Sequence, residues 1–431
     1  MSLAFMFSLG GFLLLGAIGM PISLAAFASS IAYLFMTGQD VGLVAEQSLN
    51  GLFNSYVLLA VPLFILAANF MNAGTISDRL LNFCVAIVGR MRGGLAHVNV
   101  LASLIFSGMS GSAIADAAGI GRVIIDLMCR NNRYPPGYAA ALTAASSVIG
   151  PIIPPSIPMI LYALISDTSI GFLFLGGIVP GLLLALVLMI LNAITARRRN
   201  FARDEAVPLR DIPRLTMRAF PALMLPVILL YGIYGGVTTP TEAAAVAAVY
   251  ALILSVLFYR SLTWKDFYKL VLDGARSTSV VGLIIASALV LNYLVASENV
   301  PAMVAGQLAG LEMSPVVFLL GVNVLILLLG CLFDATTLLL IVVPLFLPAA
   351  KMLGIDLVHF GVVITVNIMI GLVTPPYGVV LFVLNGVTGI PLRDIIREIW
   401  PFIFVLLLAL LAMTLIPSIV LWLPRMFGYG G

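Results

Sequence analysis

Charged side chains are scarce in this chain: Asp, Glu, Lys and Arg make up 9% of its 431 residues, whereas 62% of the residues are hydrophobic. The mean hydropathy is +1.18, and several apolar runs exceed the roughly 18 to 20 residues that cross a bilayer as a helix. This composition excludes a water-soluble globular protein. It predicts an all-α polytopic membrane protein.

Histidine, cysteine and the common catalytic motifs are equally scarce. His97 and His359 lie far apart in regions with few carboxylates, so they do not suggest a metal site. Cys84, Cys129 and Cys331 occur singly, which suggests neither a disulfide framework nor a zinc site. The motifs GxxxxGKS/T, HExxH, GxSxG and GxGD are missing, so ATP hydrolysis and the common intramembrane protease chemistries lack their residues. We expect neither an enzyme nor an organic cofactor.

Against this background, a Pro-Pro pair interrupts each of two long apolar segments. Residues 150–156 have the sequence GPIIPPS, and residues 371–377 have the sequence GLVTPPY. Two consecutive prolines remove two amide donors and disfavour a helical residue before them, so the helix divides and leaves carbonyls without partners. Within a bilayer such carbonyls are tolerated only where they line a cavity or bind an ion or substrate. Paired interruptions of this kind indicate the binding site of a secondary transporter.

The second half of the chain resembles the first at a nearly constant offset, as internal duplication predicts. Gly16 and Pro21, for example, correspond to Gly235 and Pro240. We expect an inverted repeat over residues 1–200, a basic cytoplasmic linker over 201–218 and a second inverted repeat over 219–431. The predicted spans are 3–19, 20–37, 51–73, 170–196, 219–236, 240–260, 277–296 and 399–423. Amphipathic helices are expected at 77–92 and 301–312.

Each predicted repeat contains a re-entrant helical hairpin, at about 93–130 and about 313–352. Each also contains a helix broken at its Pro-Pro pair, at about 135–165 and about 356–386. Each half then crosses the membrane five times, and an odd number inverts the second half relative to the first. If the hairpins were instead full spans, their polar tips would lie at a membrane surface.

Positive charge supports this topology. Arginines cluster in and just before the linker, at positions 197, 198, 199, 203, 210, 214 and 218. A cytoplasmic linker places most of the 21 Lys and Arg residues inside and both termini on the periplasmic side. A nucleic-acid-binding patch is the alternative explanation of this cluster, but membrane anchoring accounts for it and we expect no nucleic-acid partner.

The hairpin tips combine glycines with hydroxyl side chains. Residues 107–112 have the sequence SGMSGS, and residues 330–337 have the sequence GCLFDATT. Hydroxyl oxygens coordinate cations or bind a substrate, and the helix N-termini that follow the tips favour a carboxylate. Helix C-termini and free carbonyls at the breaks suit Na⁺. The pattern predicts an anion site and a cation site in one place, with close helix packing as the alternative role of the small residues.

Few charged residues lie within the apolar segments. Asp334 at the second tip is costly in lipid unless it is paired or hydrated, so we expect it to bind a donor group of the substrate or to form part of an ion site. A helix cap is its alternative role. Asp116 and Arg122 are expected to form a structural ion pair within the first hairpin. Glu242 is expected in the first turn of a helix capped by Thr239.

Five blocks of sequence resemble the large membrane subunit of tripartite ATP-independent periplasmic (TRAP) transporters. The blocks are GLAHVNV at 94–100, the tip 107–113 with DAAG at 116–119, residues 150–156, TPTEAAA at 239–245 and residues 371–376. They lie in the order of the family and extend over essentially the whole chain. The resemblance implies an elevator-type importer of the bacterial inner membrane that a sodium gradient drives.

The same resemblance implies partners and site residues. The transported organic acid would be a C4-dicarboxylate, sialic acid or another sugar acid, delivered by a periplasmic substrate-binding protein, and a separate small four-helix membrane subunit would complete the transporter. The residues expected near substrate are Ser110, Ser112, Ser156, Asp334 and Thr336. Na⁺, at two or more sites, is expected near Ser107, Gly108, Gly150, Ile153, Gly330, Cys331, Gly371 and Thr374.

Other functions remain open from the sequence. A proton-coupled carboxylate carrier of the same architecture would need a titrating carboxylate, for which Asp334 or Asp116 is available. A polytopic membrane enzyme would need catalytic motifs that the chain lacks, and a passive channel would conduct without coupling to an ion.

Overall fold

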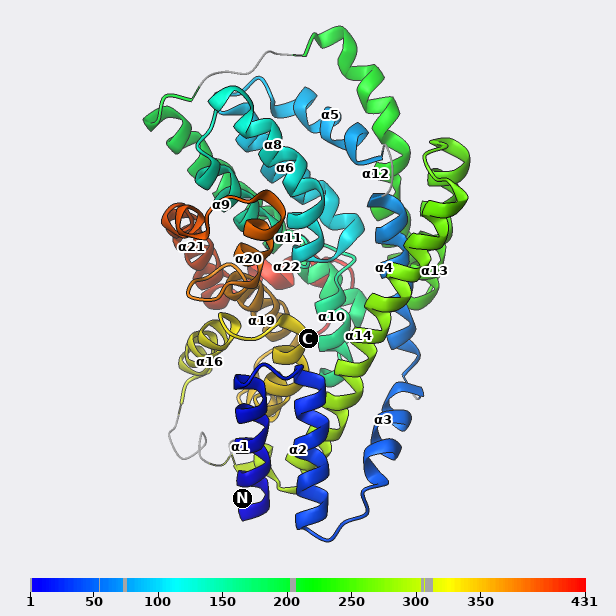
Figure 1. Ribbon diagram of the computed structural model, residues 1–431, viewed down its shortest axis with the longest axis vertical. Helices are drawn as coiled ribbons and strands as arrows, with labels where there is room; N and C mark the ends of the chain where they lie inside the picture. The colour runs from blue at the N-terminus through cyan, green and yellow to red at the C-terminus, as the bar shows by residue number, and fades with distance from the viewer. Residues whose placement is uncertain (1, 54, 73–75, 202–206, 304–305, 307–312) are drawn as a thin grey trace.

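The computed structural model is built from helices (Figure 1). It describes residues 2–53, 55–72, 76–201, 207–303, 306 and 313–431, and no strand occurs among them. The all-α prediction is confirmed. Five helices are long and apolar enough to cross a bilayer alone within these residues. They are α11 (Ile170–Arg198), α12 (Ile212–Tyr234), α13 (Pro240–Ile253, extended by a π-helical turn to Phe258), α14 (Trp264–Ser297) and α21 (Leu392–Leu415).

The remaining apolar helices are shorter. They include α1 (Leu3–Ala17), α2 (Ile22–Met36), α6 (Gly94–Ser110), α9 (Pro136–Ser147), α10 (Ile157–Ser166), α16 (Pro315–Gly330), α19 (Leu357–Gly371) and α20 (Val379–Thr388). At about 1.5 Å per residue, the 15 residues of α1 or α2 fall short of the roughly 30 Å hydrocarbon core. Proline and glycine at residues 19–21 end one helix and start the next, so the two expected spans form a pair of short antiparallel helices.

Two predicted spans have different boundaries in the structure. The expected span 51–73 is divided between α3 (Leu43–Phe53) and α4 (Ala60–Asn72), with a 3₁₀ turn at Tyr56–Leu59. The expected span 399–423 crosses the end of α21, and α22 (Ser418–Met426) follows. Here Pro417 disfavours a helical conformation in the residue before it, and Ile416 accordingly leaves the helix with φ −121° and ψ 81°. In the second half α14 is continuous, so the split at the first third span has no counterpart.

Both predicted amphipathic helices and the linker fall partly or wholly within uncertain regions of the chain. The first is α5 (Ile76–Val88). Most of the second, 301–312, lies outside the described residues, as does 202–206 of the linker. The described end of the linker forms a short 3₁₀ turn and the start of α12.

The order of elements in the second half follows that in the first. From α6 onward the first half continues with α7 (Ala113–Asp116), a π-helical turn (Ala117–Gly121), α8 (Arg122–Cys129), α9, α10 and α11. The helices α16, α17 (Ala335–Thr337), a π-helical turn (Leu338–Val342), α18 (Leu347–Met352), α19, α20 and α21 follow in the same order. α16 and α19 begin 221 residues after α6 and α9, and α20 and α21 begin 222 residues after α10 and α11.

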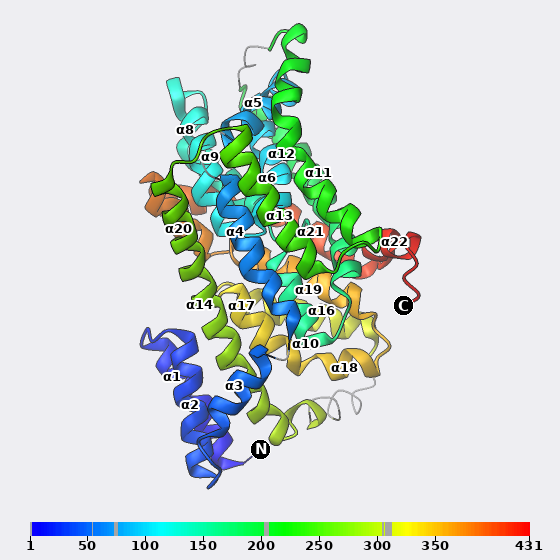
Figure 2. The same ribbon diagram turned by 90° about the vertical axis from the view of Figure 1, so that its right-hand side faces the viewer.

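The helices form two packed groups. α4, α12, α13 and α14 pack along one flank, and α2 and α3 pack against α14 towards the end that holds the N-terminus (Figures 1 and 2). In the other group α9 packs on α21 and α6, α16 packs on α19, and α11 contacts α21 and α22. Contacts of α6 with α4, α5 and α12 join the two groups.

The core of the second group is formed by the first arms of the interrupted helices. Every residue of α9 from Gly137 to Ser147 is buried, as is every residue of α19 from Val358 to Gly371. Side-chain hydrogen bonds cross-link α9 to α6: Asn99 donates to Thr143 at 2.7 Å, and Ser146 donates to the Asn99 side-chain carbonyl at 3.1 Å. Satisfied buried polar contacts of this kind hold a helix pair in one arrangement. The helix ends at each break are therefore rigidly placed.

Close packing of α11 on the first break generates a prediction. A methyl group on Gly177 would lie 2.2 Å from the carbonyl oxygen of Ile152, a backbone atom with little freedom to move. Gly177→Ala should destabilise the protein by about 1 to 3 kcal/mol because of overpacking. Thermal melting of the purified protein in detergent measures the effect.

Gly321→Ala is the matched control, because Gly321 lies in α16 with nothing within 4 Å of the added methyl group. This variant should melt at the wild-type temperature or gain up to about 1 kcal/mol from helix propensity. Equal melting temperatures of the two variants would contradict a close fit of α11 against the break.

Candidate functional site

The first interrupted helix ends at Ser147 and resumes at Ile157. Between them the chain forms tight turns, in which the amides of Gly150 and Ile152 donate to Ser147 and Ile149 at 3.1 and 3.0 Å. The second helix ends at Gly371 and resumes at Val379, with the amide of Thr374 donating to the Gly371 carbonyl at 3.0 Å. Both Pro-Pro peptide bonds are cis.

The tip of the first hairpin packs directly on the first break. Gly111 ends α6 with a φ of +58°, and a methyl group on it would lie 2.6 Å from the carbonyl oxygen of Pro155. Only glycine suits both the left-handed conformation and the close approach. Ser112 then caps α7, its hydroxyl accepting from the amide of Ala115 at 3.3 Å.

The tip of the second hairpin packs on the second break in a similar way. A methyl group on Gly371 would lie 2.8 Å from the Cα atom of Gly330, so the backbones of α16 and α19 meet where both helices end. Asp334 caps α17 and accepts three hydrogen bonds. These come from the amides of Thr336 and Thr337 at 2.9 and 3.2 Å and from the Thr337 hydroxyl at 2.5 Å.

A cavity of about 250 Å³ lies where the two tips and the two interrupted helices meet. Its lining comes from five parts of the chain: Gly111, Ser112, Ala113 and Ile114; Pro151, Ile157 and Pro158; Asp334, Ala335 and Thr336; Met369, Leu372 and Val379; and Val281 of α14. The helices α10 and α20 begin beside it, and their N-terminal dipole ends favour an anion. The cavity thus combines hydroxyl groups, one carboxylate and helix N-termini within an apolar wall.

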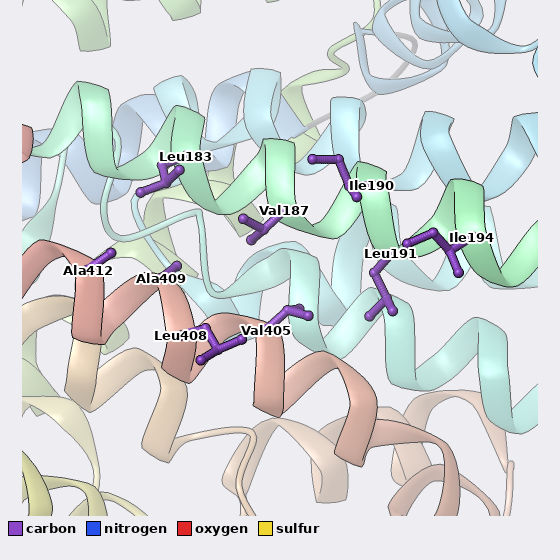
Figure 3. Close-up of a pocket in the computed structure, with 9 residues that line it drawn as sticks. All are labelled: Leu183, Val187, Ile190, Leu191, Ile194, Val405, Leu408, Ala409 and Ala412. Atoms are coloured by element: carbon purple, nitrogen blue, oxygen red, sulfur yellow. The ribbon is translucent and has the colours of Figure 1, made fainter.

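Other hollows lack this combination. A groove of about 300 Å³ between α11 and α21 is lined by leucine, isoleucine, valine and alanine alone (Figure 3). It offers no polar group for a carboxylate or a cation. A larger open hollow of about 650 Å³ is lined by Lys351, Asp356 and Arg425 among others, but by none of the predicted site residues.

The structure brings only some of the predicted substrate residues to the cavity. Ser112, Asp334 and Thr336 line it. Ser110 and Ser156 are buried beside it, and their hydroxyls are engaged within the protein: Ser110 donates to the Asp116 carboxylate, and Ser156 donates to the carbonyl of Pro151. Asp334 occupies both positions that the sequence left open, because it caps a helix and also faces the cavity. The substrate-binding roles stay predictions.

The predicted sodium residues lie at the contacts between tips and breaks. The side-chain hydroxyls of Ser107 and Thr374 donate to carbonyls of their own helices, at 2.5 and 2.7 Å. They would therefore contribute mainly backbone oxygens, as would Gly108 and Gly150. Gly330, Cys331 and Gly371 meet at the second contact, and Ile153 packs its side chain on Gly181.

Two observations fit a hard cation near the first contact. Among the described residues, no backbone amide beyond Ser110 caps the carbonyls at the end of α6. Nearby, the Oδ2 atom of Asp116 is buried without a hydrogen-bond partner. Oxygen atoms of these two kinds are the ligands that hard cations prefer. The residues present therefore fit a sodium ion.

The expected ion pair between Asp116 and Arg122 is wrong. Asp116 is 3% exposed and accepts from Ser110, whereas Arg122 is exposed to the surface, and no ion pair joins these two described residues. Residues six positions apart lie on different faces of a helix, since only spacings of three, four or seven return to the same face. The sequence offered one signal for the actual arrangement: Asp116 is the first acidic residue after the serine-rich tip.

Comparison with known proteins identifies the family. Residues 9–419 match the family described as "Tripartite ATP-independent periplasmic transporter, DctM component". This chain belongs to that family. It is therefore a multi-pass membrane subunit of a transporter and not an enzyme, as the sequence predicted.

Individual relatives in the TRAP family agree over nearly the full chain. The sialic acid TRAP transporter large permease protein SiaM of Vibrio cholerae is 40% identical over 98% of this chain and 99% of its own length. The C4-dicarboxylate TRAP transporter large permease protein DctM of Pseudomonas aeruginosa is 41% identical over 86% of this chain and 87% of its own. The sialic acid TRAP transporter permease protein SiaT of Haemophilus influenzae is 37% identical, and the match covers 95% of this chain and 66% of that protein.

A solved structure supports the fold. The YdaH transporter of Alcanivorax borkumensis, whose crystal structure is described as having an unusual topology, superposes with a TM-score of 0.64 over 91% of this chain and 89% of that one. The two sequences are 16% identical. The likeness therefore concerns the fold alone.

The capping role of Asp334 yields a stability prediction. Asp334→Ala removes the oxygens that accept from Thr336 and Thr337, and loss of an N-cap costs about 0.5 to 2 kcal/mol. Asp334→Asn keeps a capping oxygen and should melt close to the wild-type temperature. Differential scanning fluorimetry of the purified variants compares them, and identical melting of all three proteins would argue against a cap at this position.

Proposed function

We propose that this chain is the large membrane subunit of a sodium-coupled importer that moves an organic acid across the bacterial inner membrane by an elevator mechanism. The observation that carries the proposal is the cavity in which both hairpin tips and both interrupted helices meet. Family membership establishes a TRAP transporter permease. Sodium coupling, the elevator motion and the substrate class are the proposal.

The lining of the cavity supports a carboxylate substrate. Ser112 and Thr336 present hydroxyl donors, and the N-termini of α10 and α20 add positive dipole ends. Asp334 would accept a hydrogen bond from a hydroxyl or amide group of a sugar acid. The relatives named above are permeases for sialic acid and C4-dicarboxylates, and another, YiaN of Escherichia coli, is one for 2,3-diketo-L-gulonate. All of these compounds carry carboxylates.

Sodium would be held at the two contacts between tip and break. Carbonyl oxygens near Ser107, Gly108, Gly150 and Ile153 would serve the first site. Those near Gly330, Cys331, Gly371 and Thr374 would serve the second. A bound cation would supply positive charge next to an anionic substrate. The tips themselves orient the substrate, and the close contacts at Gly111 and Gly330 exclude water from behind the cavity.

The arrangement of helices supports inverted repeats and a two-part motion. The constant shift of 221 to 222 residues between elements is what a duplicated unit would produce. The group formed by α6–α11 and α16–α22 would move against a scaffold of α1–α4 and α12–α14. Val281 of α14 is the one scaffold residue at the cavity. Moving net positive charge inward gains about 2.3 kcal/mol per elementary charge per 100 mV.

Two partners complete the proposed transporter: a periplasmic substrate-binding protein and a small four-helix membrane subunit. The relative SiaT is longer than this chain, which spans 66% of it, and its additional length is available for a fused subunit. On α12 the large apolar side chains Met217, Phe220, Val227 and Tyr231 are exposed, as expected for a face covered by lipid or by a second membrane protein. Both termini would be periplasmic and the arginine-rich linker cytoplasmic.

Sodium dependence is the direct test. Vesicles containing this chain, its small subunit and its binding protein should accumulate radiolabelled sialic acid or a labelled C4-dicarboxylate when Na⁺ is outside. Replacing Na⁺ by K⁺ should lower the initial rate at least tenfold. Accumulation driven by a pH gradient without Na⁺ would instead support the proton-coupled carrier, for which the buried Asp116 is the available carboxylate.

Asp334→Asn tests substrate recognition in the same vesicles. Because Asn retains the helix cap but loses the carboxylate, uptake at low substrate concentration should fall at least about tenfold, or about 1.4 kcal/mol. Asp126→Asn is the control, since Asp126 is exposed on α8 away from the cavity. Equal uptake by Asp334→Asn and the control would remove Asp334 from the substrate site.

A further inference from the structure

Asp116 is a buried carboxylate that the proposed function leaves without a role. It is the last residue of α7 in the second arm of the first hairpin, and it is 3% exposed. Its Oδ1 atom accepts a hydrogen bond from the Ser110 hydroxyl. Its Oδ2 atom has no hydrogen-bond partner among the described residues. An ionised carboxylate buried in this way is costly unless a positive charge lies beside it.

The unpartnered oxygen faces the first break. A methyl group on Gly150 would lie 2.5 Å from Oδ2, so the carboxylate rests directly on the glycine at which the first interrupted helix ends its turns. The carbonyl oxygen of Ser147 lies 3.2 Å from the same point. Oδ2 is therefore placed against the segment whose carbonyls are proposed to hold sodium.

The surrounding helices hold Asp116 in this position. A methyl group on Gly121, in the π-helical turn after Asp116, would lie 2.5 Å from the Thr143 methyl group and 3.0 Å from the Asp116 carbonyl oxygen. The hairpin arm is thus packed tightly on α9. The carboxylate cannot reach the surface without separating these helices.

Asp116 also contacts the substrate side of the tip through one intermediate. The amide of Ser112, which lines the cavity, donates to the Ser110 hydroxyl at 3.4 Å, and Ser110 donates in turn to Asp116. A change in the charge beside Oδ2 would therefore act on the residues that shape the cavity.

We propose that Oδ2 of Asp116 is a direct ligand of a monovalent cation bound between the first hairpin and the first break. The inference rests on the proposed function only in taking that cation to be Na⁺. The ligand set consists of oxygen atoms alone, which suits a hard cation. The bound cation supplies the positive charge that the buried carboxylate lacks, and Ser110 connects its presence to the tip.

The two halves of the chain then differ in charge at their cation sites. The residue 221 positions after Asp116 is Thr337, whose hydroxyl donates to Asp334 at the second tip. The carboxylate of the second half thus lies at the cavity, whereas that of the first half lies behind it. A negative charge at the first site makes that site the tighter of the two for a cation.

Thermal melting in sodium tests the inference without substrate or transport. The full chain with its small subunit is purified in detergent and melted over a series of NaCl concentrations, with choline chloride keeping the ionic strength constant. Sodium should raise the wild-type melting temperature until the site saturates. In Asp116→Asn, the concentration that gives half of the shift should rise at least tenfold, because the amide keeps an acceptor for Ser110 but loses the anionic ligand.

Two further variants complete the test. Gly150→Ala places a methyl group at the position of the ion and should weaken the sodium response in the same way, whereas Asp126→Asn on exposed α8 should keep the wild-type response. Asp116→Asn should melt no lower than wild type in choline chloride, since it removes an uncompensated charge. If its sodium response matches the wild type, the assignment of Asp116 is overturned.

The result also separates the two proposals. A wild-type protein that shows no sodium response would overturn both the Asp116 ligand and sodium coupling. A normal sodium response that Asp116→Asn weakens, together with vesicles that take up no organic acid, would support the cation site and overturn the proposed substrate class.

Discussion

The structure depends on one constraint: a polar backbone group inside a bilayer needs a partner. Each Pro-Pro pair removes two donors from a helix at membrane depth, and the chain responds in both halves by packing a glycine-rich hairpin tip on the break. Gly111 meets Pro155 and Gly330 meets Gly371 at distances that allow no side chain. The exposed ends of the interrupted helices are thereby buried in protein, where irregular backbone is tolerated. The cavity is what remains between the two tips.

The rigid placement of these ends comes from buried polar contacts as well as from apolar packing. Asn99, Thr143 and Ser146 bind α9 to α6, and in the other half Asn367 donates to the side chain and carbonyl of Asn323 at 2.9 and 2.8 Å. In the absence of water, such contacts cannot be exchanged for solvent. They favour movement of the helices around the cavity as one body, which is the behaviour that an elevator requires.

Backbone features were predictable from the sequence, and side-chain partners were not. Proline and glycine act locally, so residues 150–156 and 371–377, the tips and the cap at Thr239 lie where their chemistry indicates; Thr239 and Glu242 form a reciprocal capping box. The split of the span 51–73 into α3 and α4 could not be found in this way, because α14, its counterpart in the second half, is continuous. The partner of Asp116 was also missed. Its nearest charged residue along the chain, Arg122, points to another face, and only the folded hairpin brings Ser110 to it.

The duplicated architecture acquires an asymmetric site by changing one capping residue. Ser112 and Asp334 occupy equivalent positions, each the N-cap of the short helix after a tip and each lining the cavity. A serine presents a hydroxyl that can donate, whereas an aspartate presents oxygens that only accept when it is ionised. A molecule that carries a carboxylate at one end and hydroxyl or amide groups at the other can satisfy both sides at once in only one orientation. Inverted halves with identical caps would not distinguish the two ends, so the substitution of one cap gives a nearly symmetric backbone a polar direction.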